Sequence, residues 1–237
     1  MRYNRILLKL SGEALAGASG KGLDGGTMSL FARQIASVAK GGTQVAIVVG
    51  GGNIFRGLTG VGSGFDRVHG DQMGMLATVI NSIGLSLCLR SAGVEAEVFS
   101  STKMEPMCRY YVRDDAVRFM ERGGVAIIAG GTGNPFFTTD SAAALRACEI
   151  GADALLKGTK VDGVYDSDPK KNPEAKRYET LTFEKAVADN LKVMDATAFT
   201  LCRENNIPIV VFDMNSEGTL ERIAAGETSL GTVVNNG

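Results

Sequence analysis

Short runs of apolar residues alternate along the chain with longer stretches in which apolar positions recur at helical spacing. The apolar runs predict buried strands at residues 5–10, 45–49, 96–99, 125–129, 154–157 and 208–212. The helical spacing predicts helices at residues 28–40, 72–91, 115–122, 141–150, 183–190, 197–205 and 220–225. Val, Ile and Leu occupy both faces of the strands, as in a parallel sheet that is covered on both sides. The pattern predicts an α/β fold, a three-layer αβα sandwich with a mostly parallel central sheet.

Three of the predicted strands run directly into glycine-rich breaks. The strand at 5–10 is followed by Ser11 and Gly12, the strand at 45–49 by residues 50–53, and the strand at 125–129 by residues 130–135. Glycine lets backbone N–H groups come close to a phosphate. Ligands of open α/β sheets lie beyond the carboxyl ends of the strands, where these breaks are. Together with Lys9, the breaks predict a nucleotide or phosphoryl-transfer site.

Composition narrows the classes of partner and compartment. The 237 residues are 44% apolar and carry a net charge of −1, which allows one sizeable core and argues against a nucleic-acid partner. We find no signal-peptide pattern and interpret no apolar run as long enough to span a bilayer, so the protein is expected in the cytoplasm without a membrane partner. The cysteines form no C-x-x-C pair and are predicted to be buried free thiols: Cys88, Cys108, Cys148 and Cys202.

The common nucleotide and hydrolase motifs are absent. The chain has no Walker A pattern, no G-x-G-x-x-G after a strand, no protein-kinase motif set and no G-x-S-x-G elbow. His69 is the only histidine, which excludes a histidine-rich metal site. Phosphoryl transfer needs mainly cations and positioned donors. Lys9 and Lys157 both end predicted strands and are followed within three residues by glycine, although each could instead be an ordinary exposed lysine.

Five stretches, in order along the whole chain, resemble bacterial uridylate kinases of the amino acid kinase superfamily. They are residues 9–15 (KLSGEAL), 50–57 (GGGNIFRG), 71–75 (DQMGM), 132–140 (TGNPFFTTD) and 157–165 (KGTKVDGVY). The first and last are shared in looser form with aspartate, glutamate and carbamate kinases. The stretches 71–75 and 132–140 are the specific ones.

The resemblance implies transfer of the γ-phosphoryl group of ATP to UMP, in pyrimidine nucleotide biosynthesis. Mg²⁺ would be carried mainly by the ATP phosphates, since no carboxylate cluster looks like a metal cage. The resemblance also implies a homohexamer, with GTP as activator and UTP as inhibitor. Residues 1–237 would form one domain, the N-terminal part mainly the UMP site and the C-terminal part mainly the ATP site. The alternatives are an amino acid or carbamate kinase of the same fold and a non-catalytic nucleotide sensor.

The resemblance also assigns individual residues. The catalytic residues would be Lys9, Lys157 and Asp195, with Asp195 orienting the lysines. ATP would be bound by Lys9, Leu10, Ser11, Gly12, Gly52, Arg56, Thr159, Tyr165 and Asp168. UMP would be bound by Gly51, Asp71, Thr132, Gly133, Asn134, Pro135, Phe136, Phe137, Thr138 and Thr139. The allosteric segment would comprise Gly17, Ala18, Ser19, Gly20, Lys21 and Gly22.

Several of these residues also have a purely structural interpretation. Asp71 and Asp195 could cap the helices predicted to follow them, and Thr139 or Asp140 could cap the helix at residue 141. A surface or packing role is the alternative for the remaining ones: Arg56, Phe136, Phe137 and the glycine-rich residues 17–22. Residues 57–64, also glycine-rich, are predicted to be a mobile loop.

Overall fold

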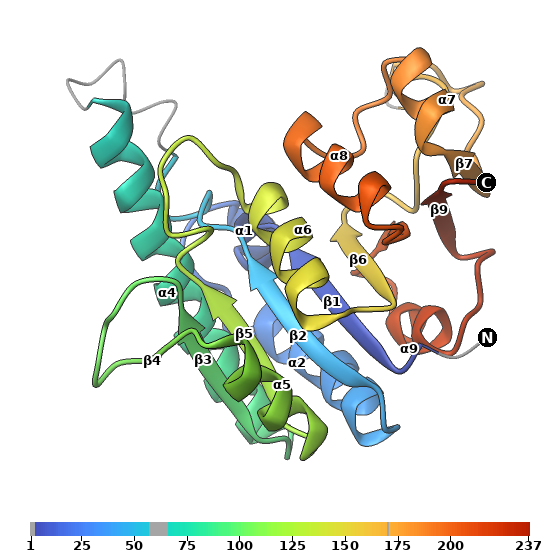
Figure 1. Cartoon of the computed structure of the whole chain (residues 1–237). Coiled ribbons are helices and arrows are strands. Elements are labelled where there is room, and N and C mark those ends of the chain that lie inside the picture. The colour runs from blue at the N-terminus through green and yellow to red at the C-terminus, as the bar shows by residue number, and fades with distance from the viewer. Residues whose placement is uncertain (1–2, 57–65, 170) are drawn as a thin grey trace.

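A mostly parallel sheet runs through the computed structural model, which describes residues 3–56, 66–169 and 171–237 (Figure 1). The loop predicted at 57–64 lies outside the described residues. Among those described, nine strands form one sheet in the order β4-β3-β5-β2-β1-β6-β8-β9-β7, and only the β8–β9 pairing is antiparallel. The strands are β1 (Arg5–Leu10), β2 (Gln44–Val49), β3 (Ala96–Ser100), β4 (Arg109–Tyr110), β5 (Val125–Ala129), β6 (Ala154–Thr159), β7 (Thr180–Thr182), β8 (Ile209–Asp213) and β9 (Gly231–Asn235).

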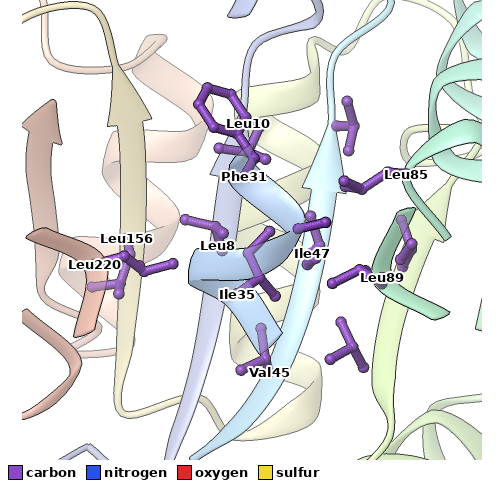
Figure 2. Close-up of a cluster of buried hydrophobic side chains, with 14 of the residues drawn as sticks. Leu8, Leu10, Phe31, Ile35, Val45, Ile47, Leu85, Leu89, Leu156 and Leu220 are labelled. Carbon is purple, nitrogen blue, oxygen red and sulfur yellow. The ribbon is translucent and has the colours of Figure 1, made fainter. Parts of the chain in front are cut away.

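Helices cover both faces of the sheet, as predicted. They are α1 (Gly12–Leu15), α2 (Gly25–Lys40), α4 (Arg67–Ser91), α5 (Arg113–Glu121), α6 (Thr139–Ile150), α7 (Phe183–Ala188), α8 (Ala196–Glu204) and α9 (Thr219–Ala224), with a 3₁₀ turn at Gly17–Ser19. Helices α2, α4 and α9 pack on one face, where the core includes Leu8, Ile35 and Leu85 (Figure 2). Helices α5 to α8 pack on the other face, around residues such as Leu7. The predicted three-layer α/β fold is therefore confirmed.

The differences from the predicted elements lie at edges and helix ends. Strands β4, β7 and β9 were not predicted; β4 has two residues and β7 three, too few to give a clear apolar pattern. Helix α4 begins at Arg67, because the Asp66 carboxylate accepts from the His69 N–H and caps a polar first turn. Asp71 therefore lies inside the helix, and its predicted role as an N-cap is wrong.

Helix α4 also corrects the expectation about membrane spans. It is long and apolar enough, by length and composition alone, to cross a bilayer. Its Leu85 and Leu89 are fully buried against the sheet, whereas Leu76, Ile80 and Leu87 on its outer side are 51%, 50% and 57% exposed. The helix thus forms part of the core and carries a second apolar stripe that faces outward. The four cysteines are free thiols as predicted, but only Cys108 and Cys202 are fully buried.

Strand register brings the two predicted catalytic lysines together. Strands β1 and β6 pair in parallel, and Lys9 lies directly beside Lys157. Leu8 and Leu10 belong to the core beneath α2 and α4. Since side chains alternate along a strand, Lys9 points to the opposite face, which α6 covers.

Candidate active site

A carboxylate from the first turn of α6 joins the two lysines. The Lys9 Nζ lies 2.6 Å from Asp140 Oδ1, and the Lys157 Nζ lies 2.9 Å from Asp140 Oδ2. Lys157 also donates to the carbonyl of Val193 at 2.7 Å. The Lys9 side chain is only 9% exposed and that of Asp140 15%. Each carboxylate oxygen therefore holds one cation, in a place where water screens the charges little.

The pKa values of this cluster are set by burial and by mutual charge. Burial alone would raise the pKa of the Asp140 carboxyl, but the charges of Lys9 and then Lys157 outweigh it and hold that pKa below the ordinary value. Burial, assisted by the like charge of Lys9, lowers the pKa of Lys157 against the opposing pull of Asp140. Two lysines share one carboxylate, so the formal charge of the cluster is positive when all three groups are ionised.

Asp195, predicted to orient the lysines, has different partners. Its carboxylate accepts from the Ala198 N–H at 2.9 Å and so caps α8, the role that the sequence left open. It also accepts hydrogen bonds from the hydroxyls of Thr138 and Ser141 at the start of α6. The lysine contact belongs to Asp140, which the sequence considered only as a cap. Thr138 is the cap of α6, so the expectation of Thr139 or Asp140 there is wrong.

Two predicted phosphate-binding glycines are needed for close backbone packing. A Cβ atom on Gly12 would lie 2.6 Å from the Gly50 carbonyl oxygen. A Cβ atom on Gly51 would lie 2.7 Å from the Gly74 carbonyl oxygen of α4. Any larger residue would push the glycine turns apart. At Gly52 the neighbouring atoms are 3.7 Å away or more, and this residue faces the pocket.

A buried pair of amides that the sequence did not reveal holds the glycine turn. Asn53 and Asn81 exchange two hydrogen bonds, of 3.0 and 2.8 Å. Asn81 also donates to the Gly50 carbonyl at 2.6 Å, and Asn53 donates to the Gly22 carbonyl at 2.6 Å. The segment predicted to be allosteric, residues 17–22, is thereby joined to the turn that lines the pocket.

Three adjoining cavities open around the lysine cluster, and the first brings together most of the predicted UMP-binding residues. It is lined by Gly51, Gly52, Phe55, Gly70, Asp71, Gly74, Met75, Thr78, Gly131, Thr132, Asn134, Phe137, Thr138 and Thr139. Asp71 accepts from the Phe136 N–H at 2.7 Å and from Arg67 Nε at 2.7 Å. Asp71 therefore ties the loop before α6 to helix α4.

The two phenylalanines of this loop do not pack into the core. Phe136 is 64% exposed and Phe137 49% exposed, so the packing interpretation of these side chains is wrong. The Arg67 guanidinium lies 5.4 Å from the Phe136 ring centroid. Among the described residues, Gly133, Pro135 and Phe136 are not part of the cavity lining; Gly133 packs against Ser101 instead.

The second cavity lies directly over the lysine cluster and is lined by Lys9, Glu13, Gly52, Phe55, Arg56, Arg67, Asp71, Phe137, Thr138, Thr139, Asp140 and Asp195. Arg56, predicted to grip a phosphate, forms an ion pair with Glu13 at its mouth. Ser11 caps α1 by accepting from the Ala14 N–H at 3.1 Å. As far as the described residues define the three cavities, Leu10, Ser11 and Gly12 are outside their lining.

The third cavity, of about 470 Å³, is lined by the predicted ATP-binding residues Thr159, Tyr165 and Asp168 and by Lys157, which was predicted to be catalytic. The Thr159 hydroxyl donates to the Val161 carbonyl at 2.7 Å, and the Tyr165 hydroxyl donates to Asp162 at 2.7 Å. Because Lys157 also binds Asp140, this cavity adjoins the second one at the lysine cluster.

Comparison with known proteins agrees with this arrangement. The model of the amino acid kinase family matches residues 4–213. The uridylate kinases of Parabacteroides distasonis and Bacteroides thetaiotaomicron are 52% and 53% identical over 235 residues, 99% of each chain. The crystal structure of UMP kinase from Bacillus anthracis superposes with a TM-score of 0.96 at 40% identity, covering 100% of this chain and 97% of that one. UMP kinase from Ureaplasma parvum gives a TM-score of 0.92 at 40% identity and covers 100% of both chains.

Proposed function

We infer that this chain, which belongs to the amino acid kinase family, is an enzyme that transfers the γ-phosphoryl group of ATP to UMP, forming ADP and UDP. The observation that carries this inference is the buried Lys9–Asp140–Lys157 cluster, placed between a cavity lined by the UMP motif and a cavity lined by the ATP motif. Phosphoryl transfer requires positive charge between two bound nucleotides, and this cluster supplies it.

The cluster acts by electrostatic stabilisation. The transferring phosphoryl group has a loose transition state, which leaves little covalent chemistry to the protein. The ammonium groups of Lys9 and Lys157 neutralise the charge on the moving group, and Asp140 keeps two like charges close together before substrate arrives. Asp195 contributes as a positioning residue, because it holds the Thr138 and Ser141 hydroxyls at the start of the helix that carries Asp140.

UMP recognition uses the first cavity. Asp71 is the acceptor for the ribose hydroxyls, and it is already aimed by its bonds to Arg67 and to the Phe136 N–H. The side chains of Asn134 and Thr138 and the backbone of Thr132 suit the uracil edge and the α-phosphate, since all line the same cavity. Arg56, which lines the second cavity, supplies a guanidinium for a phosphate of ATP once it leaves Glu13.

ATP occupies the third cavity, with Tyr165 beside the adenine and Lys157 and Thr159 toward the phosphates. The N-terminal part of the chain thus makes mainly the UMP site and the C-terminal part mainly the ATP site. The described residues contain no group of three or more His, Cys, Asp or Glu side chains that could hold a metal. Mg²⁺ would accordingly be bound by ATP phosphates and water, where it neutralises phosphate charge.

Two further features support proposals for the oligomeric state of the enzyme and for its regulation by nucleotides. The outward stripe of Leu76, Ile80 and Leu87 on α4 supports association of this chain with further copies, and a homohexamer is the proposed form. Residues 17–22 support a response to GTP, since Asn53 joins them to the glycine turn. UTP contains the same nucleoside as UMP, so the proposed inhibition by UTP is binding in the UMP cavity in place of UMP. The four free thiols favour a cytoplasmic enzyme.

The decisive experiment measures ADP release with ATP and, in turn, UMP, CMP, aspartate, glutamate or carbamate. Turnover is expected with UMP and at most weakly with CMP. Turnover with an amino acid or carbamate but not with UMP would replace the proposal by the related-kinase alternative. Nucleotide binding without turnover of any acceptor would favour a sensor.

A further inference from the structure

A buried arginine that the proposed mechanism does not use lies on α6, behind the loop that lines the UMP cavity. Arg146 is 6% exposed, and its Nη1 donates to Glu149 at 2.7 Å. Its guanidinium lies 4.3 Å from the Tyr111 ring centroid, and the Tyr111 hydroxyl donates to the same Glu149 oxygen at 2.9 Å. A buried cation is retained only when it is paired and hydrogen-bonded, so this group is firmly held on one side.

The other side of Arg146 reaches the pocket loop through one serine. Arg146 Nη2 donates to the Ser101 hydroxyl at 3.0 Å. Arginine can only donate, so Ser101 must accept this bond and use its own proton elsewhere. The nearer acceptor is the Gly131 carbonyl at 2.8 Å; the Ala129 carbonyl, at 3.2 Å, already accepts from the Ser101 N–H. The hydrogen bonds therefore run in one direction, from Arg146 to Ser101 to Gly131.

A second set of bonds holds the same loop two peptides earlier, at the peptide between Ala129 and Gly130. The buried Thr78 hydroxyl of α4 accepts from the Gly130 N–H at 2.8 Å and donates to the Met75 carbonyl at 2.6 Å. Gly131 has a φ of +60°, in the left-handed region that glycine adopts readily. The loop's own bond, from the Gly133 N–H to the Gly130 carbonyl at 3.0 Å, does not hold the Gly131 carbonyl. The carbonyl and N–H of a trans peptide point in opposite directions. Fixing the Gly131 carbonyl therefore also fixes the direction of the Thr132 N–H, and Thr132 lines the cavity.

We propose that Arg146, acting through Ser101, is a positioning residue that presets the pocket loop for the nucleoside monophosphate. The inference rests on the proposed function, because it takes UMP as the occupant of this cavity. Arg146 lies outside the lining that the described residues give the cavity, so its influence passes through the loop backbone. The affinity for UMP depends on the hydrogen bonds from Arg146 through Ser101 to Gly131, whereas the affinity for ATP does not.

The test measures UMP binding by calorimetry without ATP, together with the two KM values. Ser101→Ala removes the donor to Gly131 and leaves the Arg146–Glu149 pair in place. It is expected to raise the Kd of UMP about tenfold, equal to 1.4 kcal/mol, with the KM of ATP changed by less than about twofold. Arg146→Lys keeps the charge beside Glu149 but loses the planar fork, so it should weaken UMP binding similarly. The double variant, Ser101→Ala with Arg146→Lys, should bind UMP no more weakly than Ser101→Ala alone, because both substitutions break the same chain of bonds.

Two controls separate positioning from a general loss of stability. Ser101→Thr keeps the hydroxyl and should retain UMP binding near the wild-type value. Tyr111→Phe removes the bond from Tyr111 to Glu149 but keeps the bond from Arg146 to Ser101. This variant too should bind UMP normally. Wild-type UMP affinity in Ser101→Ala, or equal losses for UMP and ATP, would overturn the inference. Failure of the wild-type protein to bind UMP would instead overturn the proposed function, and the inference with it.

Discussion

The two nucleotide cavities differ in how their polar side chains are held. In the UMP cavity, the bonds connect segments far apart in sequence: Asp71 to Phe136, Thr78 to Gly130, and Ser101 to Gly131. In the proposed ATP cavity, the shorter bonds of the two hydroxyls are local, from Thr159 to Val161 and from Tyr165 to Asp162, and Thr159 reaches the Phe212 carbonyl of β8 at 3.4 Å. The loop backbone is anchored to the rest of the fold where Thr232 accepts from the Val164 N–H at 2.8 Å.

This difference indicates where selectivity is built. A pocket whose loop is fixed by other elements loses little conformational freedom on binding, and a misfitting ligand cannot easily reshape it. The UMP cavity has this character. In the proposed ATP cavity, the Thr159 and Tyr165 hydroxyls are held mainly by local contacts, which suits a ligand recognised mainly through its phosphates. The lysine cluster connects the cavities: Lys157 lines this one, and Lys9 lines the second cavity, which shares Gly52, Asp71 and Thr138 with the first.

The largest effect is expected at this shared centre. Lys9→Ala removes one of the two cations from the moving phosphoryl group. Loss of a preorganised electrostatic donor should lower kcat about a hundredfold, about 3 kcal/mol, and should affect both KM values much less. Steady-state kinetics on a variant shown by circular dichroism to be folded gives the measurement. Unchanged turnover would remove Lys9 from the mechanism and leave the two cavities without a common centre.

Asp140→Asn should have the next largest effect. Its kcat should fall about tenfold, equal to 1.4 kcal/mol, because the two lysines then face each other without a carboxylate.

The same variant tests how stability depends on pH. The pKa of Asp140 is held below the ordinary value of 3.8. Its stabilising contribution is therefore complete above pH 3.8 and is lost as the pH falls through the lowered pKa of the folded state. Melting curves should show a weaker acid dependence in Asp140→Asn than in the wild-type protein.

Asp195→Asn is the matched control for that variant. An asparagine oxygen still caps α8. Among the described residues, the ion pairs of both lysines are with Asp140, and Asp195 acts on Lys157 only through its charge, so a smaller loss in kcat is expected. A larger loss in Asp195→Asn than in Asp140→Asn would restore Asp195 as the main carboxylate of the cluster.

Asp71→Asn tests the UMP side alone. One oxygen of Asp71 accepts from both Arg67 and the Phe136 N–H. An asparagine oxygen that kept these bonds would leave an NH₂ group, which only donates, in place of the second acceptor oxygen for the ribose hydroxyls. The KM of UMP should rise about tenfold, or 1.4 kcal/mol, while the KM of ATP changes by less than about twofold. Equal changes in both KM values would show that the two cavities are not independent.

Tyr165→Phe should have the smallest effect. It removes only the bond to Asp162 and keeps the ring beside the adenine. A change of less than about twofold in the KM of ATP is expected, consistent with the small net value of an exposed hydrogen bond. A tenfold rise would mean that the hydroxyl contacts ATP, and the contrast between the cavities would then be weaker.

Hydrophobic periodicity predicted the central strands and the covering helices, whereas the segments of the cavities were assigned by the resemblance to uridylate kinases. The pattern missed β4 and β7, which are too short to show a period, and also β9, and it started α4 at the apolar stripe although Asp66 begins the helix earlier. Asp140 and the Asn53–Asn81 pair were missed for another reason. Their roles depend on contacts between segments distant in sequence, and no local pattern encodes such a contact.

The pairing of Lys9 with Lys157 also limits how the gene can change in length. Insertion or deletion of one residue within β1 would turn one lysine to the opposite face of the sheet, among the leucines packed beneath α2. A change of two residues would keep the face but move the ammonium about 6.6 Å along the strand, beyond reach of Asp140. Length variation in this protein is therefore expected in its surface loops and not within β1 or β6.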